Sequence, residues 1–356
     1  MNRDRMLVWG LSNNKAGTEK VIYNYCKALP DRAIDFLCYD NPESYSDLLD
    51  NGMNRFFTIP IKIQHPLQYE RALRNFVNSH MREYNALWFN INDISNIDLL
   101  LHAKRCGVPR RIAHMHNAGM PSNPITVAFS RLHEKAFSGA LTERWACSES
   151  AGRFLYGDSS FTVVPNFVDS AKVVFSEEKR KLIRQKYCLE DKWVVGAVGR
   201  LEKQKNYGFL VDAFNRLRDV CSNSVLVIVG EGSMRKELEE RILACNLKIG
   251  RDVIMPGSCS DIQAWYSAFD VAAYPSLYEG LSLSILEAQF NGLPLVLSDG
   301  ISDECKISEQ VSFEPLDDEI WAKRFVGVSR QTQHLTEKAN QFAISNAPAI
   351  AKSLFS

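Results

Sequence analysis

Two glutamates with seven residues between them, Glu279 and Glu287, stand where a strand is expected to give way to a helix. The apolar run 271–274 predicts the strand, and Gly280 opens the small and polar stretch where the helix would start. The first N–H groups of a helix lack partners within the helix, so this start can bind an anion. With one carboxylate before the helix and one inside it, the segment indicates a ligand with an anionic part and a hydroxyl-rich part.

Glu287 also has a purely structural explanation. Ser284 and Glu287 have the spacing of a capping box, in which the glutamate bonds back to the N–H of the N-cap residue. Glu279 lies in a turn between a tyrosine and a glycine, and it could be only a solvated side chain. We favour hydroxyl binding, in the way a carboxylate holds a ribose, because both glutamates flank one helix start.

A basic turn follows the expected strand 193–198. Arg200 and Lys205 lie five residues apart after a glycine. Such a pair suits a phosphate ligand, since arginine supplies a planar fork of donors and lysine a mobile point charge. A solvated basic turn is the alternative. This turn and the helix start at Ser282 both follow strands of one expected parallel sheet. Both should therefore project from its carboxyl edge, where ligands bind in open α/β folds.

The N-terminal half offers two histidines at the end of an expected strand. His114 and His116 are two residues apart, so their side chains face the same side of the sheet. No Cys, Asp or Glu stands close by in sequence to complete a metal site with them. A structural role is the ordinary one for a lone histidine, but His116 would end the strand at the ligand edge. Gly17 follows the first strand, where a glycine lets the backbone approach a ligand closely.

Composition narrows the class of protein. The chain has 356 residues, more than one core usually serves, and 42 basic against 42 acidic side chains, which excludes a globally basic nucleic-acid binder. Its nine scattered cysteines contain no C-x-x-C pair and are expected to be reduced thiols. Neither a signal peptide nor a run near the roughly 18 apolar residues of a membrane span is found. We expect a cytoplasmic protein.

Short apolar runs alternate with amphipathic stretches along the chain, which predicts parallel sheets covered by helices. The rhythm breaks at residues 165–169, the candidate hinge, and restarts at Trp193. Strands are expected at 6–9, 33–39, 56–63, 86–90, 111–115, 144–148, 161–164, 193–198, 225–229, 253–255, 271–274 and 295–297. Helices are expected near 18–29, 69–84, 97–106, 129–138, 207–220, 232–245, 262–268, 318–328 and 334–342, besides the one after Gly280.

Together these motifs resemble the retaining nucleotide-sugar glycosyltransferases of family four, especially the branch acting in bacterial capsule and exopolysaccharide assembly. The resemblance runs from the first strand to about residue 297. It is carried by the two-glutamate spacing, the Gly-Arg…Lys turn, Val229-Gly-Glu-Gly232, Pro165-Asn-Phe-Val-Asp169 and the Arg-Ile-Ala-His-Met-His-Asn strand end. The chain departs from the family in having Ala16-Gly17 where a Gly-Gly pair is usual, and after Val311 the similarity is weak.

The resemblance implies an α/β chain of the GT-B fold, with two Rossmann-like domains facing across a deep cleft. We expect an acceptor-side domain at 1–168, a donor domain at 169–325, and a C-terminal helical segment at 326–356 that packs back on the first domain. The implied catalytic residues are His116 and Glu279, the latter against the transferred sugar. The implied donor-binding residues are Gly17, Arg200, Lys205, Ser282, Leu283 and Glu287, with Arg200 and Lys205 on the diphosphate and Glu287 on the ribose.

The implied reaction is retaining transfer of a sugar from a nucleotide sugar, with UDP as the expected nucleotide, to a saccharide or lipid-linked acceptor in surface polysaccharide biosynthesis. No Asp-x-Asp motif occurs, so we expect no metal and no other cofactor. A nucleotide-sugar 2-epimerase of the same fold and a non-catalytic nucleotide-sugar binding subunit are the alternatives. A dinucleotide-dependent oxidoreductase is disfavoured, because no G-x-G-x-x-G follows a strand.

A local basic segment suggests peripheral contact with an anionic membrane. Between residues 52 and 82 five basic residues stand against one acid, for a net charge of 5 − 1 = +4, interleaved with aromatic residues. Lys104, Arg105, Arg110 and Arg111 form a second basic cluster. Attraction to anionic lipid is worth about 1 kcal/mol per surface Lys or Arg, so contact with the inner face of the plasma membrane is plausible. An ordinary charged helix face is the alternative.

Overall fold

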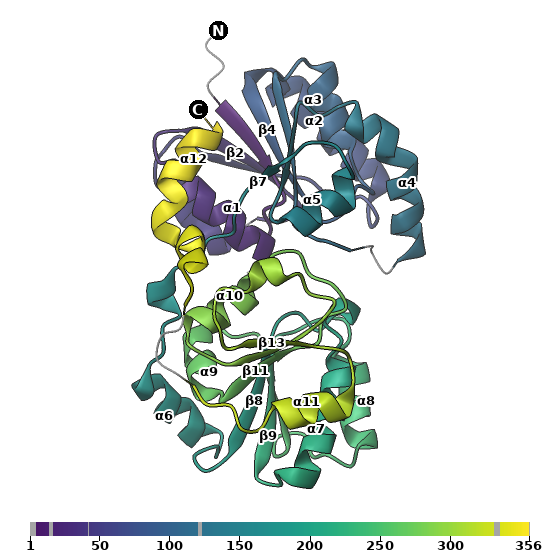
Figure 1. Cartoon of the computed structure of the whole chain (residues 1–356). Coiled ribbons are helices and arrows are strands. Elements are labelled where there is room, and N and C mark those ends of the chain that lie inside the picture. Colours follow the sequence, from purple (N-terminus) through teal and green to yellow (C-terminus); the bar gives the residue numbers. More distant parts are fainter. Residues whose placement is uncertain (1–4, 14–16, 42, 120–122, 331–334, 356) are drawn as a thin grey trace. The chain divides into compact units, whose positions relative to one another are not determined.

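The computed structural model describes residues 5–13, 17–41, 43–119, 123–330 and 335–355 (Figure 1). The chain folds into two units. Unit 1 comprises Met1–Phe167 and Ser345–Ser356, and unit 2 comprises Val168–Ile344. The first boundary lies inside the segment 165–169 that breaks the sequence pattern. Residues 326–344, which the sequence analysis placed with the C-terminal helical segment, belong to unit 2.

Unit 1 is built on a parallel sheet whose described strands run in the order β3-β2-β1-β4-β5-β6-β7. In its register Trp9 of β1 lies opposite Leu37 of β2 and Phe89 of β4. The order turns back between β1 and β4, as in doubly wound folds. The strands are β1 (Arg5–Trp9), β2 (Ala33–Cys38), β3 (Arg55–Thr58), β4 (Tyr84–Ile91), β5 (Arg110–Met115), β6 (Glu143–Ala146) and β7 (Thr162–Val163).

The helices of unit 1 begin where the sequence supplies caps and prolines. Pro66 opens α2, and Asn123 caps α4 by accepting from the N–H of Ile125 while Pro124 takes the first helical position. Both helices therefore start earlier than the apolar spacing alone predicted. The helices are α1 (Gly17–Lys27), α2 (Pro66–His80), α3 (Asp98–Arg105), α4 (Pro124–Ser138), α5 (Glu149–Tyr156) and α12 (Ala347–Phe355), with short 3₁₀ turns at Glu43–Leu49 and Met81–Glu83.

The C-terminal helix α12 packs on the sheet of unit 1, beside α1 (Figure 1). The ring of Phe355 lies 5.1 Å from that of Trp88 and 5.2 Å from that of Trp145, both edge-on. Arg110 of β5 donates to the carbonyl of Leu354 at 2.7 Å. Arg32 donates to the carbonyl of Phe355, so aromatic burial and two charge-assisted hydrogen bonds hold this helix.

Unit 2 repeats the architecture with a six-stranded parallel sheet, in the order β10-β9-β8-β11-β12-β13 among the described residues. The strands are β8 (Trp193–Val198), β9 (Ser224–Val229), β10 (Val253–Gly257), β11 (Val271–Tyr274), β12 (Leu295–Ser298) and β13 (Val311–Glu314). The helices are α6 (Glu177–Lys186), α7 (Tyr207–Val220), α8 (Arg235–Ala244), α9 (Ile262–Ala268), α10 (Leu283–Phe290) and α11 (Asp318–Arg324). Shorter 3₁₀ turns lie at Ser170–Lys172, Lys203–Lys205, Asp303–Cys305 and Glu337–Phe342, and the turn Ile344–Asn346 spans the boundary with unit 1.

Most elements expected from the sequence are present, and a few expectations are wrong. The extended stretch predicted at 56–63 is a strand only to Thr58, because Pro60 lacks the N–H that a ladder needs. The stretch predicted as a helix at 334–342 has 3₁₀ turns over Glu337–Phe342, and its residue 334 lies outside the described residues. None of the described helices is long and apolar enough to cross a membrane.

Candidate functional site

The basic turn and the glutamate segment meet at the carboxyl edge of the sheet of unit 2. The turn with Arg200 follows β8, and the segment with Glu279 follows β11, which is the neighbour of β8. The strand order reverses between these two strands, and this is the place where α/β sheets bind ligands. Two hydrogen bonds join the segments, because Gln204 donates from its side chain to the carbonyl of Tyr278 and accepts at its backbone carbonyl from the N–H of Leu277, both at 2.8 Å.

Lys205 and Glu279 form a buried ion pair. Lys205 Nζ lies 2.5 Å from Glu279 Oε1, and both residues are less than a tenth exposed. The hydroxyl of Ser276 donates to the same carboxylate oxygen at 2.7 Å. A charge taken out of water needs a partner with good geometry, and here each ion supplies it for the other. The ammonium group is thereby held at the ligand edge of the sheet.

Glycine packing brings the two neighbouring strand ends together. Gly230, in the motif Val229-Gly-Glu-Gly232, has a φ of +149°, and a Cβ atom built there would lie 1.9 Å from the carbonyl oxygen of Gly199. No side chain is compatible with that approach, so glycine is required. The resemblance motif therefore keeps the turn that carries Arg200 and Lys205 close against the end of β9.

Glu287 lies in α10, the helix whose start was predicted to bind an anion. The N-cap is Ser282 and the first helical residue is Leu283, so Ser284 is inside the helix. The capping-box explanation, with Ser284 as the N-cap, is therefore wrong. Instead Glu287 Oε2 accepts a hydrogen bond from the hydroxyl of Tyr266 at 3.0 Å. Burial, and then the neighbouring Tyr274 and Glu287, raise the pKa of Tyr266 well above its ordinary value, so the phenol stays a donor.

Arg200 differs from Lys205 in its surroundings. Its side chain is exposed, and within the described part of the chain its guanidinium has no hydrogen-bond or ion-pair partner. The turn that carries Lys205 thus also offers the five donors of an arginine fork. Ser282 is partly exposed and Leu283 is buried at the start of α10, where the first N–H groups have no intrahelical partner. The guanidinium and the helix start suit the anionic end of a ligand, and the carboxylate of Glu287 suits a hydroxylated end.

In unit 1, His116 is oriented by Asn90. The side-chain N–H of Asn90 donates to the carbonyl of Trp9 at 3.0 Å, so its Oδ1 must act as acceptor. His116 Nε2 lies 2.9 Å from that oxygen and therefore carries the proton. Burial lowers the pKa of His116 to about 3. The ring is thus neutral at pH 7, and its Nδ1, which has no hydrogen-bond partner among the described residues, can accept a hydrogen bond.

His114 is the more buried of the two predicted histidines. Its ring lies 4.1 Å from that of His116, stacks on Trp88 at 6.0 Å, and has no hydrogen-bond partner at either nitrogen among the described residues. Burial, and then the neighbouring His116, lower its pKa well below the ordinary value. No cluster of three or more candidate metal ligands occurs in the described ranges. Of the two histidines, His116 is the one with a partly exposed side chain.

Gly10, after β1, is a glycine of unit 1 that the backbone conformation and a close contact both require. It has a φ of +105°, and a Cβ atom there would lie 2.9 Å from both Cβ and the carbonyl oxygen of Asn90. Gly17, the glycine chosen from the sequence, opens α1, and a Cβ atom there would meet no described atom within 4 Å. The space around Gly17 does not test whether this residue contacts a ligand, so that contact stays a prediction.

Three supporting residues escaped the sequence analysis: Tyr266, Ser276 and Asn90. Tyr266 and Asn90 hold predicted site residues from another element, so no local motif marks those pairs, whereas Ser276 lies three residues before Glu279 in the same loop. Of the three, only Asn90 could have been identified from the sequence. It is a polar residue at the end of an apolar strand, and a buried amide there requires hydrogen-bond partners.

Two Rossmann-like units in one chain, with cations and carboxylates at the carboxyl edge of the second sheet, define the GT-B class of glycosyltransferase folds. Solved structures share this fold over the whole length. Anabaena Alr3699/HepE, in complex with UDP and glucose, superposes with a TM-score of 0.78 at 19% identity and 99% coverage of both chains. The lipopolysaccharide outer core galactosyltransferase WaaB gives a TM-score of 0.66 at 16% identity, over 98% of this chain and 99% of that one.

Sequence comparison leads to the same class. The family of glycosyl transferases group 1 matches residues 179–324. The putative glycosyltransferase EpsF of Bacillus subtilis (strain 168) is 29% identical over 82% of this chain and 78% of its own length. An Escherichia coli relative, UDP-Gal:alpha-D-GlcNAc-diphosphoundecaprenol alpha-1,3-galactosyltransferase, is 28% identical over 83% of this chain and 79% of its own. Residues 179–324 thus resemble group 1 glycosyltransferases, and the chain as a whole has the GT-B fold.

Proposed function

We propose that this glycosyltransferase moves a hexose from a UDP-sugar to a saccharide or lipid-linked acceptor, with retention at the anomeric carbon, in bacterial surface polysaccharide biosynthesis. The observation that carries the proposal is the Lys205–Glu279 pair, which joins the turn that carries the exposed Arg200 to the segment that leads into α10. The group 1 match over residues 179–324 supports the reaction class, and this arrangement fits a nucleotide diphosphate bound to a sugar.

The choice of donor and acceptor rests on similar proteins. The Anabaena protein with the same fold was solved in complex with UDP and glucose, and also with UDP-glucose. The Escherichia coli relative is named for a UDP-galactose donor and a lipid diphosphate acceptor. A further relative, from Erwinia amylovora, is named for amylovoran biosynthesis and is 35% identical over 29% of this chain. These names support a UDP-sugar and a polysaccharide pathway for this chain.

The proposed reaction breaks the bond between the anomeric carbon and the diphosphate oxygen and forms a bond to an acceptor hydroxyl oxygen, which loses its proton. Negative charge grows on the leaving diphosphate. Arg200, Lys205 and the first N–H groups of α10 would stabilise this charge without a metal, because they are fixed before the reaction begins. Glu287 would hold the ribose, and Glu279 would lie against the transferred sugar while it positions Lys205.

The two remaining predicted site residues lie in unit 1. His116 stays a predicted catalytic residue, and its neutral ring with a free Nδ1 suits an acceptor of hydrogen bonds. Gly17 stays a predicted donor-binding residue.

A panel of nucleotide sugars tests the donor. A ligand present at about 100 times its Kd stabilises a protein by about 2.7 kcal/mol, so the true donor should raise the melting temperature measurably. We expect UDP-hexoses to do so and sugars of other nucleotides to have smaller effects. Stabilisation by none of the panel would contradict the assignment of the site.

Product analysis separates transfer from its rivals. With an acceptor present, NMR of the product should show the anomeric configuration of the donor. A nucleotide-sugar 2-epimerase would instead change the sugar of the donor without any acceptor. A non-catalytic binding subunit would show neither transfer nor slow hydrolysis of the donor.

Contact with an anionic membrane at the inner face of the plasma membrane also stays a proposal. The basic segment 52–82 that suggested it is partly occupied by internal contacts. Arg55 pairs with Asp35 and Glu83, and Lys62 pairs with Asp98. The aromatic side chains of Tyr69 and Phe76 in this segment are buried, so they are unavailable to a membrane.

A further inference from the structure

Arg330 caps two helices of unit 2 at once. It lies in the segment after α11, and it donates to the carbonyls of the two C-cap residues, Phe269 of α9 at 3.0 Å and Asn291 of α10 at 2.7 Å. It donates further to the carbonyl of Tyr266 at 2.8 Å and to Asn291 Oδ1 at 2.6 Å. The last carbonyls of a helix lack partners within the helix and form its negative end, so a cation is favoured there. One planar guanidinium thus fastens two helix ends to each other.

Carbonyl groups, and no carboxylate, hold this cation among the described residues. Its guanidinium carbon lies 4.5 Å from the ring centre of Phe175, in a cation–π contact. Burial, and then the neighbouring Arg180, lower the pKa of Arg330 to about 9, which leaves the side chain charged at pH 7. Taking a charge out of water costs free energy, so the carbonyls at the two helix ends are what keep Arg330 in this place.

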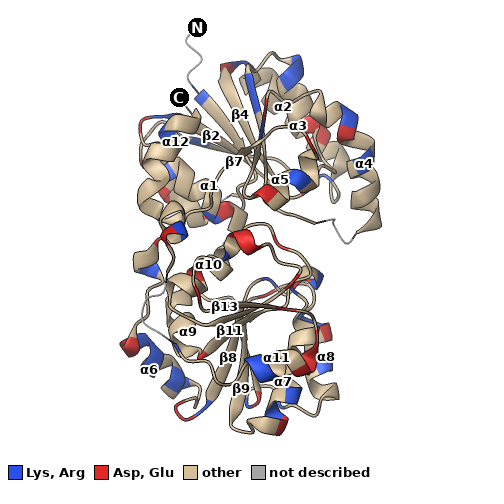
Figure 2. Ribbon diagram, in the orientation of Figure 1, with Lys and Arg blue, Asp and Glu red and all other residues tan. Residues whose placement is uncertain are grey.

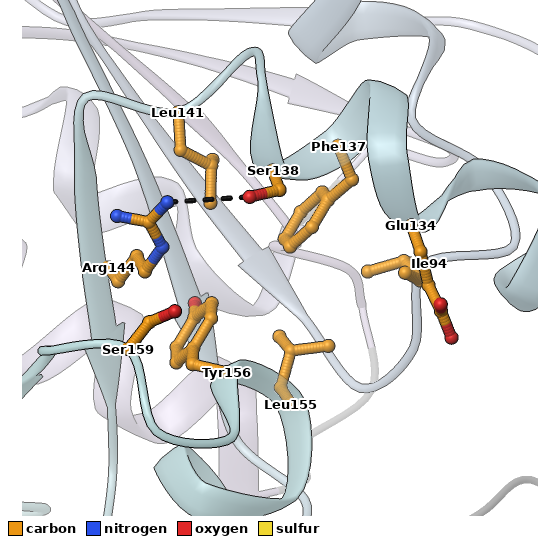
Figure 3. A pocket seen from close by; sticks show the side chains of 9 residues that line it. All are labelled: Ile94, Glu134, Phe137, Ser138, Leu141, Arg144, Leu155, Tyr156 and Ser159. Carbon is orange, nitrogen blue, oxygen red and sulfur yellow. Dashed lines mark hydrogen bonds between the residues drawn. The ribbon is translucent and has the colours of Figure 1, made fainter.

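Arg144 of β6 shows the contrasting case. It lines a cavity of about 180 Å³ in unit 1, and within the described residues its side chain makes one hydrogen bond, to Ser138 at 3.4 Å (Figure 3). An arginine of this kind keeps donors for water or a ligand. In Arg330, by contrast, each terminal nitrogen already makes two hydrogen bonds, so its partners are inside the protein.

Arg330 closes a ring of hydrogen bonds that contains Glu287. Tyr266 donates from its hydroxyl to Glu287 Oε2 at 3.0 Å, and its carbonyl accepts from Arg330. Asn291 donates from its N–H to the carbonyl of Glu287 at 3.0 Å, and its own carbonyl accepts from Arg330. One guanidinium therefore holds two neighbours of Glu287, one that bonds to its side chain and one that bonds to its backbone.

The side chain of Asn291 fixes the orientation of this ring. Asn291 is buried, and its amide nitrogen donates to the carbonyl of Val173 at 2.6 Å and to the hydroxyl of Ser267 at 3.5 Å. Because the nitrogen is used on that side, the amide oxygen faces Arg330 and needs a donor. A donor at position 330 is thus required by the groups around it.

We infer that Arg330 is a positioning residue of the donor site, which sets the place of the Glu287 carboxylate. The inference rests on the proposed function, which assigns that carboxylate to the ribose of the nucleotide sugar. Arg330 acts from the C-terminal end of α10, one helical turn beyond Glu287. Without it, α9 and α10 lose a link between their ends, and the hydroxyl of Tyr266 is no longer held in register with Glu287. A misplacement of about 1 Å is enough to weaken a binding or catalytic contact strongly.

Arg180 provides a matched control, because it meets the same end of α9 in another way. It belongs to α6, which has five basic residues against two acidic ones (Figure 2). Its guanidinium donates to the carbonyl of Phe269 at 3.0 Å and pairs with Asp270 at 2.6 Å. Among the described residues it makes no hydrogen bond to α10, so its loss should disturb α9 without disturbing the link to Glu287.

Titration calorimetry of the full-length protein with UDP and with inorganic pyrophosphate tests the inference. Arg330→Met should weaken UDP binding about tenfold, as removal of the supporting residue behind a metal ligand does. Binding of pyrophosphate should be unchanged, because pyrophosphate has no ribose. Arg180→Met should bind both ligands like the wild type. A role in stability alone would lower the melting temperature without separating UDP from pyrophosphate.

A second variant keeps the charge. Arg330→Lys offers one nitrogen in place of the planar fork and cannot reach both helix ends. Its affinity for UDP should therefore lie between those of the wild type and Arg330→Met. If Arg330→Met does not fold, the comparison of Arg330→Lys with the wild type decides.

A double variant shows whether Arg330 acts through Glu287. In the Glu287→Gln background, Arg330→Met should change UDP affinity by no more than about twofold, because the carboxylate that it places is already gone. The inference is overturned if the two losses multiply, if Arg330→Met binds UDP like the wild type, or if it loses pyrophosphate equally. Wild-type protein that binds no UDP would overturn the proposed function and the inference together, whereas UDP binding that survives Arg330→Met overturns the inference alone.

Discussion

Lys205 Nζ and Glu279 Oε1 lie 2.5 Å apart, although 74 residues separate them in the chain. One follows β8 and the other follows β11, so the pairing of two parallel strands brings them together. Because both are buried, the lysine is held at one position before any ligand arrives. A preset cation stabilises developing negative charge without reorganising, and this makes the pair the centre of the proposed site.

The stability of unit 2 should depend on the two residues as a pair. Lys205→Met leaves the carboxylate of Glu279 buried without its partner and should lower the free energy of unfolding by about 3–5 kcal/mol. The double variant Lys205→Met/Glu279→Gln should recover most of that loss. Urea unfolding of the wild type, both single variants and the double variant measures the coupling. If the two single losses simply add in the double variant, the pair does not act as a unit.

Lys205→Ala should lower kcat at least tenfold, because removing one fixed donor to a developing anion costs on the order of 2.7–4 kcal/mol of transition-state stabilisation. A chelator such as EDTA should leave the rate of the wild type unchanged. Lys203→Ala, in the same turn but exposed, serves as the matched control. Loss of activity in EDTA, restored by a divalent cation, would refute the metal-independent reaction.

Glu287→Gln should weaken donor binding by about 10–100-fold, because a hydrogen bond to a charged group contributes about 1.5–3 kcal/mol. Tyr266→Phe should have a smaller effect in the same direction, since it removes only the hydroxyl that orients the carboxylate. Titration with UDP measures both, and Glu309→Gln, an exposed carboxylate of unit 2, is the control. Unchanged affinity in Glu287→Gln would leave the residue a purely structural one.

His116 should make folding sensitive to acid. Its pKa is about 3 in the folded chain, against an ordinary value of about 6.5, so the unfolded chain binds more protons between these values. The stabilisation from its neutral state is fully present above about pH 6.5 and is lost as the pH falls toward 3. His116→Gln should therefore reduce the dependence of the unfolding free energy on pH in this window. The part of that dependence that comes from His114 should remain. An inflection of kcat near pH 6.5 that disappears in His116→Gln would contradict the low pKa.

Two glycines should respond differently to the same change. Gly10→Ala should cost several kcal/mol, because a φ of +105° is strained for alanine and the new Cβ meets Asn90 at 2.9 Å. Gly17→Ala should leave thermal stability unchanged, since the Cβ meets no described atom within 4 Å. If Gly17 touches the donor as predicted, the same variant should raise KM for the nucleotide sugar. Normal kinetics in Gly17→Ala would remove it from the site.

Local patterns in the sequence determined the class of fold and the principal residues. The limits of β8, β11 and α7 follow from apolar periodicity and from glycine or proline breaks, which act over a few neighbouring residues. Short stretches of sequence likewise predict that Arg200, Glu279 and His116 follow the ends of strands. A parallel sheet then carries such residues to one edge of each unit, whatever the details of the packing.

Tertiary structure decided the partners and the exposed faces. Glu287 is held by Tyr266 and not by a capping box, because α10 begins at Leu283. His116 receives its tautomer from Asn90 on the neighbouring strand. Helix α4 is apolar on two sides, so periodicity cannot say which side is covered. Only the packing of Phe137 inward shows that Phe129 and Leu132 are left outside. Pairings between distant elements are a property of the folded chain, and no short stretch of sequence encodes them.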